Sequence, residues 1–139
     1  MGFLNKLFGG VKYPELDQTS SAAKKLDGVR GSLEELTEKV KDPMEVVPTE
    51  NSAYVFIGNP PNNFGMAWIE GGKVKNFKTL SEEKGVEQKQ LVNIVDALAE
   101  VYQQNEGVDR FSTTIGGRTV TVTPSQDLAS EVQQIILNA

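Results

Sequence analysis

The residues of this chain that could do acid–base or metal chemistry are its carboxylates, because the sequence holds neither histidine nor cysteine. Histidine is the side chain whose ordinary pKa lets it carry protons near neutral pH. Cysteine supplies thiolate nucleophiles and soft metal ligands. Their absence excludes Ser-His-Asp and Cys-His triads, zinc sites built on these residues and thiol redox chemistry.

Carboxylates gather in two places along the chain. The first group is Glu34, Glu35, Glu38 and Asp42, and the second is Glu82-Glu83. Paired carboxylates can act as acid and base or bind Mg²⁺ and Ca²⁺. The first group falls on the polar side of a predicted helix, and the second has no apolar surroundings that would raise its pKa. We therefore expect solvated surface charges, and the sequence predicts no catalytic residue, no metal ligand and no cofactor.

Two glycine pairs, Gly71-Gly72 and Gly116-Gly117, each lie between predicted strands. A phosphate site needs a glycine-rich loop that opens a helix, and neither pair precedes one. Both pairs therefore predict two-residue hairpin turns.

The charge balance argues against nucleic acid as a partner. The net charge is −5, and the lysines and arginines are scattered rather than gathered into a basic stripe. Apolar runs are too short for a membrane span, and the first residues do not fit a secretory signal. We expect a cytoplasmic protein.

The sequence predicts an amphipathic N-terminal segment over residues 1–12. Phe3, Leu4, Leu7 and Phe8 share one helical face, and Gly9-Gly10 ends the turn. The gain from burying these side chains is similar to the entropy cost of ordering the segment, so it needs a surface. We expect it to pack on its own domain or on another copy of the chain. A partner protein, weak peripheral contact with an acidic membrane, and disorder of the segment are the alternatives.

The polar residues 13–21 predict a linker, and residues 22–139 predict a single domain. Apolar residues spaced by three and four from Ala22 to Val40 indicate one helix across Gly28 and Gly31. Strands follow over 54–57, 64–70 and 73–79. Their register around Gly71-Gly72 places Trp68 opposite Lys75 and Met66 opposite Phe77, and the lysines of the last strand indicate a guarded sheet edge.

A second helix is predicted from about Val86 to Gln104, followed by a hairpin over 110–115 and 118–123. In its register one face carries apolar pairs and the other carries serine and threonine hydroxyls, as in a sheet with one solvated side. Thr123-Pro124-Ser125-Gln126 fits a capping box that starts a last helix.

The predicted fold is α+β, with three amphipathic helices on a five-stranded antiparallel sheet in the order α-β-β-β-α-β-β-α. This order of elements resembles that of profilin-like and roadblock-like domains. The resemblance implies a sheet roofed by helices that can enclose a pocket. Its lining here would be Tyr54, Phe56, Met66 and Trp68.

Two further places are candidates for contact with a partner. The first is the loop Asn59–Asn63, where Pro60 and Pro61 stiffen a surface rich in amides, although these residues also simply end one strand and begin the next. The second is Trp68, which is either an exposed contact residue or, under a helix, part of the core beside Lys75. The sequence favours a non-catalytic protein-interaction or scaffold module that binds a protein partner or itself. A small-ligand-binding or sensor domain is the alternative.

Overall fold

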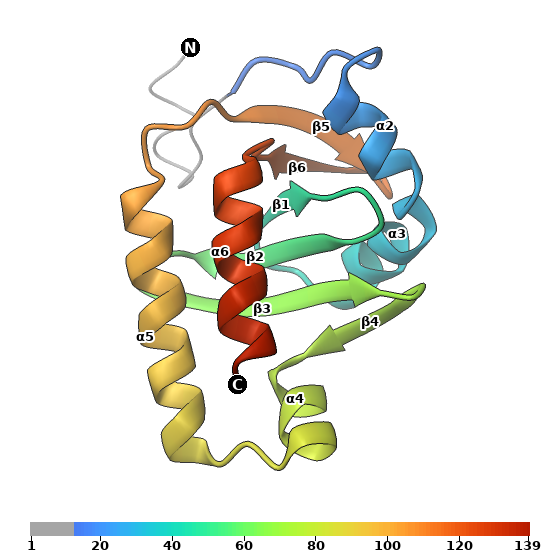
Figure 1. Cartoon of the computed structure of the whole chain (residues 1–139). Helices are drawn as coiled ribbons and strands as arrows, with labels where there is room; N and C mark the ends of the chain where they lie inside the picture. Colours follow the sequence, from blue (N-terminus) through green and yellow to red (C-terminus); the bar gives the residue numbers. More distant parts are fainter. Residues whose placement is uncertain (1–12) are drawn as a thin grey trace.

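The computed structural model describes residues 13–139, and the predicted α+β class is confirmed (Figure 1). One mixed sheet has six strands in the order β4-β3-β2-β1-β6-β5. Neighbouring strands are antiparallel except β1 and β6, which are parallel. The strands are β1 Met44–Pro48, β2 Ala53–Asn59, β3 Asn63–Glu70, β4 Lys73–Asn76, β5 Phe111–Ile115 and β6 Arg118–Val122.

Five helices in this part of the chain cover the sheet, where three were expected. They are α2 Ser21–Asp27, α3 Arg30–Lys39, α4 Phe77–Lys84, α5 Gln88–Gln104 and α6 Gln126–Leu137. Helices α2 and α3 pack on one face with Val46, Val55 and Ile69. Helices α4, α5 and α6 pack on the opposite face, where Phe56 and Trp68 lie. Successive strand residues point to opposite faces, so each strand contributes to both cores.

Strand β1 is the strand that the sequence prediction missed. It is five residues long, begins directly after Pro43 and ends at Pro48, so its pattern is too short to stand out between two prolines. All five residues are buried, because β1 pairs with β2 on one side and with β6 on the other. The expectation of five antiparallel strands is therefore wrong in number and in one pairing.

The first predicted helix is divided in two. Helix α2 ends at Asp27, and Val29 leaves the helical conformation with φ −126° and ψ 12° before α3 begins. The apolar spacing still continues across the break, since Leu26, Val29 and Leu33 are all buried. Glycine lowers helix stability, which makes Gly28 a place where the chain can change direction without losing this face.

The predicted hairpin register is confirmed from Glu70–Lys73 to Ala67–Asn76, and β4 is the edge strand of the sheet. The pairing of Met66 with Phe77 is wrong, because Phe77 begins α4. Asn76 caps this helix: its Oδ1 accepts from the Thr79 nitrogen at 3.0 Å, and Thr79 Oγ1 accepts from the Asn76 nitrogen. This reciprocal cap ends the strand.

The second hairpin has the predicted register, from Phe111–Val122 to Ile115–Arg118. On its hydroxyl face Thr114 and Thr119 are exposed. Helix α6 starts later than the capping pattern indicated. Its cap is Ser125, whose Oγ accepts from the Leu128 nitrogen at 3.1 Å.

Residues 13–21, which were predicted as a linker, contain none of the six strands and only the first residue of α2. Part of this stretch nevertheless packs on the domain. Leu16 is buried, its nitrogen donates to the Ser112 carbonyl at 2.8 Å, and the Ser112 nitrogen donates to the Pro14 carbonyl. This contact covers the outer edge of β5. Within residues 13–139 no helix is both long and apolar enough to cross a membrane.

Candidate functional site

A buried polar cluster centres on Glu45, in the middle of β1. Tyr102 of α5 donates to Glu45 Oε1 at 2.7 Å, and Arg110 Nε donates to Oε2 at 2.9 Å. The Thr123 hydroxyl also donates to Oε2. A buried carboxylate is stable only when its charge is paired and its oxygens accept hydrogen bonds, and both conditions are met here.

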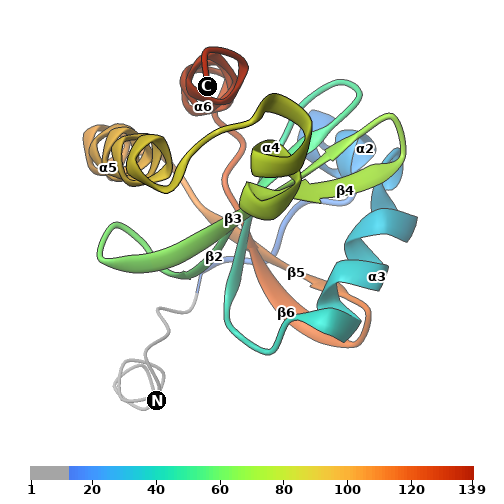
Figure 2. The same cartoon turned by 90° about the horizontal axis from the view of Figure 1, so that it is seen from below.

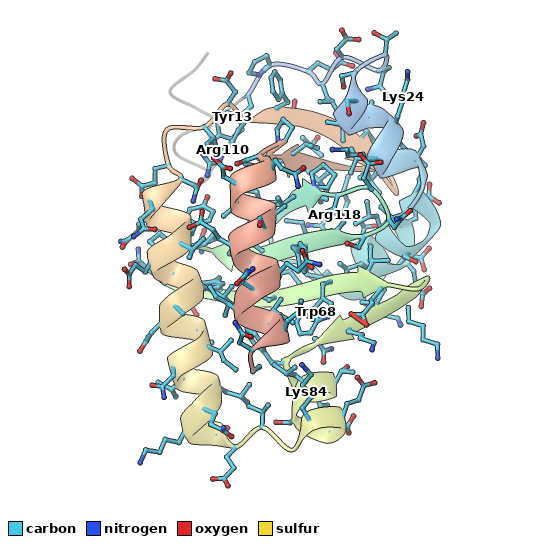
Figure 3. All side chains as sticks on the ribbon, viewed as in Figure 1. Tyr13, Lys24, Trp68, Lys84, Arg110 and Arg118 are labelled. Carbon is cyan, nitrogen blue, oxygen red and sulfur yellow. The ribbon has the colours of Figure 1, made fainter. Side chains whose placement is uncertain are left out.

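Arg110 is the cationic partner in this cluster, and 7% of its side chain is exposed. Its Nη1 donates to the carbonyls of Glu106 and Val108, and the guanidinium lies 5.2 Å from the Tyr102 ring centre. Burial is the largest single influence on the pKa of Arg110 and lowers it, but the charge and the hydrogen bond of Glu45, with smaller contributions from Tyr102 and Tyr13, together raise this pKa above its usual value. Among the described residues Nη2 has no hydrogen-bond partner. Figure 3 shows Arg110 and Tyr13 at the same corner of the molecule.

The Glu45 cluster ties elements together rather than exposing a reactive group. It joins β1, the end of α5, the segment before β5 and the residue after β6. Glu45 is buried, and both of its carboxylate oxygens already accept hydrogen bonds from the protein. Sequence reasoning missed this cluster because its centre lies on the strand that it missed.

A cleft of about 400 Å³ lies where the β2–β3 hairpin meets β4 and α4. We call it the hairpin cleft. Its apolar lining is Ile57, Phe64, Met66 and Phe77, and its polar and glycine lining is Asp42, Gly58, Asn59, Asn63, Gly65, Asn76 and Lys78. Figure 2 shows the β2–β3 turn projecting from the sheet on the side away from α3.

The end of the hairpin is shaped by Gly58. Its φ is +108°, a conformation that L side chains rarely adopt, and a Cβ there would come within 2.7 Å of the Asn63 carbonyl oxygen. Its nitrogen donates to the Pro43 carbonyl at 2.9 Å. Glycine at this position lets the two strands approach closely and holds Asn59 and Asn63 side by side at the mouth of the cleft.

Arg118 holds the backbone at Asp42, which forms a second wall of the hairpin cleft. Its guanidinium donates to the carbonyls of Thr37, Val40, Lys41 and Asp42, so it satisfies the last turn of α3 and the residues that follow. These hydrogen bonds fix the backbone at Asp42, which lines the cleft.

Helix α4 supplies the third wall. The Asn76 cap uses the side-chain oxygen, which leaves its amide nitrogen available as a donor. Phe77 packs edge-on against Trp68 with ring centres 6.4 Å apart and also lines the cleft. The cleft therefore has an apolar lining, three asparagine amides, one lysine and one aspartate.

Of the residues singled out from the sequence, Pro60 and Pro61 lie in the turn between Asn59 and Asn63, and both are partly exposed. The structure thus places the predicted contact loop directly beside the cleft. Phe3, Leu4, Leu7 and Phe8 lie outside the described residues.

Trp68 lies in the core with 3% exposure, so it offers no surface to a partner in this structure. Lys75, its cross-strand neighbour, forms ion pairs with Glu70 and Glu83. Tyr54, Phe56 and Met66 belong to the same buried cluster, together with Leu98 and Val132. Side chains of α5 and α6 pack on this cluster, and Tyr54 and Trp68 also line a pocket of about 260 Å³ against Ile136 and Leu137 of α6.

The two carboxylate groups are solvated, as expected. Glu34, Glu35, Glu38, Asp42, Glu82 and Glu83 are all exposed. Over residues 13–139 no three acidic side chains come together in a way that could hold a metal ion.

Comparison of the chain with models of known families, with curated proteins and with solved structures finds no match. A function for this chain therefore has to be inferred from its own residues.

Proposed function

We propose that this chain is a non-catalytic, cytoplasmic protein-interaction module whose contact site is the hairpin cleft. The observation that carries this proposal is the chemistry of the cleft: an apolar lining combined with two asparagine amides at the end of a proline-stiffened hairpin and a third, Asn76, at the start of α4. The occupant that fits is an extended peptide segment bearing aromatic or large aliphatic side chains.

The lining of the cleft offers suitable contacts for both the backbone and the side chains of such a peptide. Asn59 and Asn63 each offer a donor and an acceptor, and Asn76 offers a donor because its oxygen caps α4. These are the groups that pair with the N–H and C=O of a peptide backbone. Phe64, Phe77 and Ile57 offer apolar contacts for side chains. A volume of about 400 Å³ is at the small end of ligand sites, which suits a few side chains rather than a large cofactor.

The ionisable groups support binding over catalysis. The acid–base groups that line the cleft are Asp42 and Lys78, both exposed, and Glu45 is held by three hydrogen bonds in the separate buried cluster. General acid–base catalysis needs a positioned group whose pKa is matched to its task, usually by burial or a charged neighbour. Neither Asp42 nor Lys78 is buried.

The chain offers a matched pair of variants for testing the proposal. A Cβ at Gly65 would meet nothing within 4 Å, and Gly65 lines the cleft. The Cβ of Gly65→Trp therefore starts in open space, and this variant is designed to fill the cleft with its indole. Gly31 in α3 also has open space around a Cβ but lies away from the cleft lining, so Gly31→Trp is the control.

The experiment is panning of a phage-displayed peptide library on the immobilised full chain, followed by affinity measurement of the enriched peptides. We expect the enriched peptides to carry aromatic or large aliphatic residues. Gly65→Trp should weaken their affinity for the chain by about tenfold or more, which is about 1.4 kcal/mol. Gly31→Trp should leave their affinity unchanged. Failure to enrich any peptide, or peptides equally insensitive to both variants, would overturn the proposal.

A further inference from the structure

We infer that the hairpin cleft binds this chain's own N-terminal segment, with the apolar residues Phe3, Leu4, Leu7 and Phe8 of the same molecule as its occupant. This inference rests on the proposed function, because it names the peptide that the cleft takes. Other occupants, including the segment of a second copy, are outcomes of the test.

The first support is that the N-terminal segment is long enough to approach the cleft. The described chain begins at Tyr13, which lies at the same corner of the molecule as Arg110 (Figure 3), and the Arg110 guanidinium is 5.2 Å from the Tyr102 ring centre. The Tyr102 ring centre is 5.0 Å from that of Phe56, and Phe56 is 5.7 Å from Phe64, which lines the cleft. An extended chain spans about 3.3–3.6 Å per residue, so the five steps from Tyr13 back to Phe8 allow about 17 Å. The segment can therefore approach the cleft without leaving its own domain.

The second support is chemical fit. Phe3, Leu4, Leu7 and Phe8 supply the aromatic and aliphatic side chains that the lining favours. Gly9-Gly10 gives the chain freedom to turn between this segment and the body. A site within the same molecule also avoids the entropy cost of association, since the tether provides a high effective concentration.

The third support is charge. Residues 1–12 contain Lys6 and Lys12 and no acid, so the rest of the chain carries 12 cationic against 19 acidic side chains, a net charge of −7. The cationic segment is attracted to this body as a whole, while the cleft lining itself carries one charge of each sign, Asp42 and Lys78. The same net charge repels the body from an anionic membrane, which favours docking over membrane contact.

The first measurement is an amide correlation NMR spectrum of the full chain, compared with that of Phe3→Ser/Phe8→Ser. We expect shifts at the backbone amides of Gly58 and Gly65 and at the side-chain amides of Asn59, Asn63 and Asn76. Asn5→Ser, on the opposite side of the segment, should leave these signals in place. Unchanged cleft signals in the double variant would overturn the inference.

The second measurement separates docking within one molecule from docking between two. Because the chain has no cysteine, Asn5→Cys gives a unique site for a nitroxide spin label. We expect the label to broaden the cleft amides of its own molecule. In a mixture of isotope-labelled wild type and spin-labelled unlabelled variant, those signals should stay sharp, and broadening there would overturn docking within one molecule in favour of a second copy.

The two proposals fail in distinguishable ways. Removing the occupant frees the cleft, so Phe3→Ser/Phe8→Ser should tighten binding of the selected peptides by on the order of tenfold. Peptides that bind the cleft with the same affinity in wild type and double variant would overturn the inference alone. Cleft signals that respond to the segment while no library peptide binds would overturn the broader function alone.

Discussion

Tyr102 lies where an aromatic contact, a hydrogen bond and a cation meet. Its ring packs on Phe56, its hydroxyl donates to Glu45 and the Arg110 guanidinium approaches its face. Burial, then the Glu45 hydrogen bond and the Glu45 charge, raise the pKa of Tyr102 well above its usual value of 10.0. The folded protein therefore holds the phenolic proton more tightly than the unfolded chain does.

This shift predicts an alkaline loss of stability. Above pH 10 the unfolded state binds fewer protons at Tyr102 than the folded state, so the free energy of unfolding falls as the pH rises and is unaffected by this group below that point. Tyr102→Phe should cost about 1.5 kcal/mol at neutral pH, through the lost hydrogen bond to a carboxylate, and should flatten the alkaline slope. Urea titrations from pH 8 to 11, followed by Trp68 emission, measure both.

Tyr54→Phe is the control for this prediction. The Tyr54 pKa is also raised, first by burial and then by Glu70, so this variant keeps the part of the slope that belongs to Tyr102. Parallel stability curves for wild type and Tyr102→Phe would contradict the assignment of the slope to Tyr102.

At the scale of elements, the turn between β5 and β6 packs directly on α3. Gly116 and Gly117 both have positive φ, at +59° and +77°. A Cβ on Gly116 would overlap Thr37 Oγ1 in α3, whereas a Cβ on Gly117 would meet nothing within 4 Å. Thr37 is buried, and its hydroxyl donates to the Glu34 carbonyl at 2.6 Å, so it has little room to move.

Gly116→Ala should therefore destabilise the fold more than Gly117→Ala does. Both variants share the cost of a side chain at positive φ, and the additional overlap in Gly116→Ala should add about 1–3 kcal/mol. Thermal or urea unfolding measures the difference. Thr37→Ala in the Gly116→Ala background should recover part of it, and equal stabilities of the two glycine variants would show that the turn and α3 are not in contact in solution.

At the scale of the whole molecule, the sheet consists of two antiparallel units joined by one parallel pairing. Strands β1–β4 form one unit and β5–β6 the other, and they meet where β1 runs beside β6. The core under α2 and α3 includes residues of both units, among them Val46, Val55, Ile115 and Val120. A shared core makes separate unfolding of either unit costly, because each would expose the apolar face of the other.

We therefore expect a single cooperative unfolding transition. Trp68 emission reports the β1–β4 unit, and the amide signals of the Gly116-Gly117 turn report the β5–β6 unit. Their midpoints in urea should coincide in wild type. They should also shift together in Val46→Ala, which truncates a fully buried side chain at a cost of about 2–3 kcal/mol. Two separate midpoints would show that the units unfold independently.

The local sequence pattern was sufficient to predict the structure wherever neighbouring residues decide it. The two hairpins follow from glycine pairs flanked by alternating residues, and their registers are as predicted. The helices over 88–104 and 126–137 follow from apolar spacing of three and four. The absence of histidine and cysteine also limits the chemistry of the chain whatever its fold.

Tertiary structure decided what depends on residues far apart in sequence. Strand β1 exists because β2 and β6 satisfy its backbone on both sides, and Glu45 is tolerated in it because Arg110, 65 positions away, neutralises its charge. The hairpin cleft likewise combines Asp42, Asn63 and Lys78 from three separate segments. Periodicity and turn residues report only local preferences, and a six-stranded sheet with a buried ion pair depends on contacts that form once the chain has closed on itself.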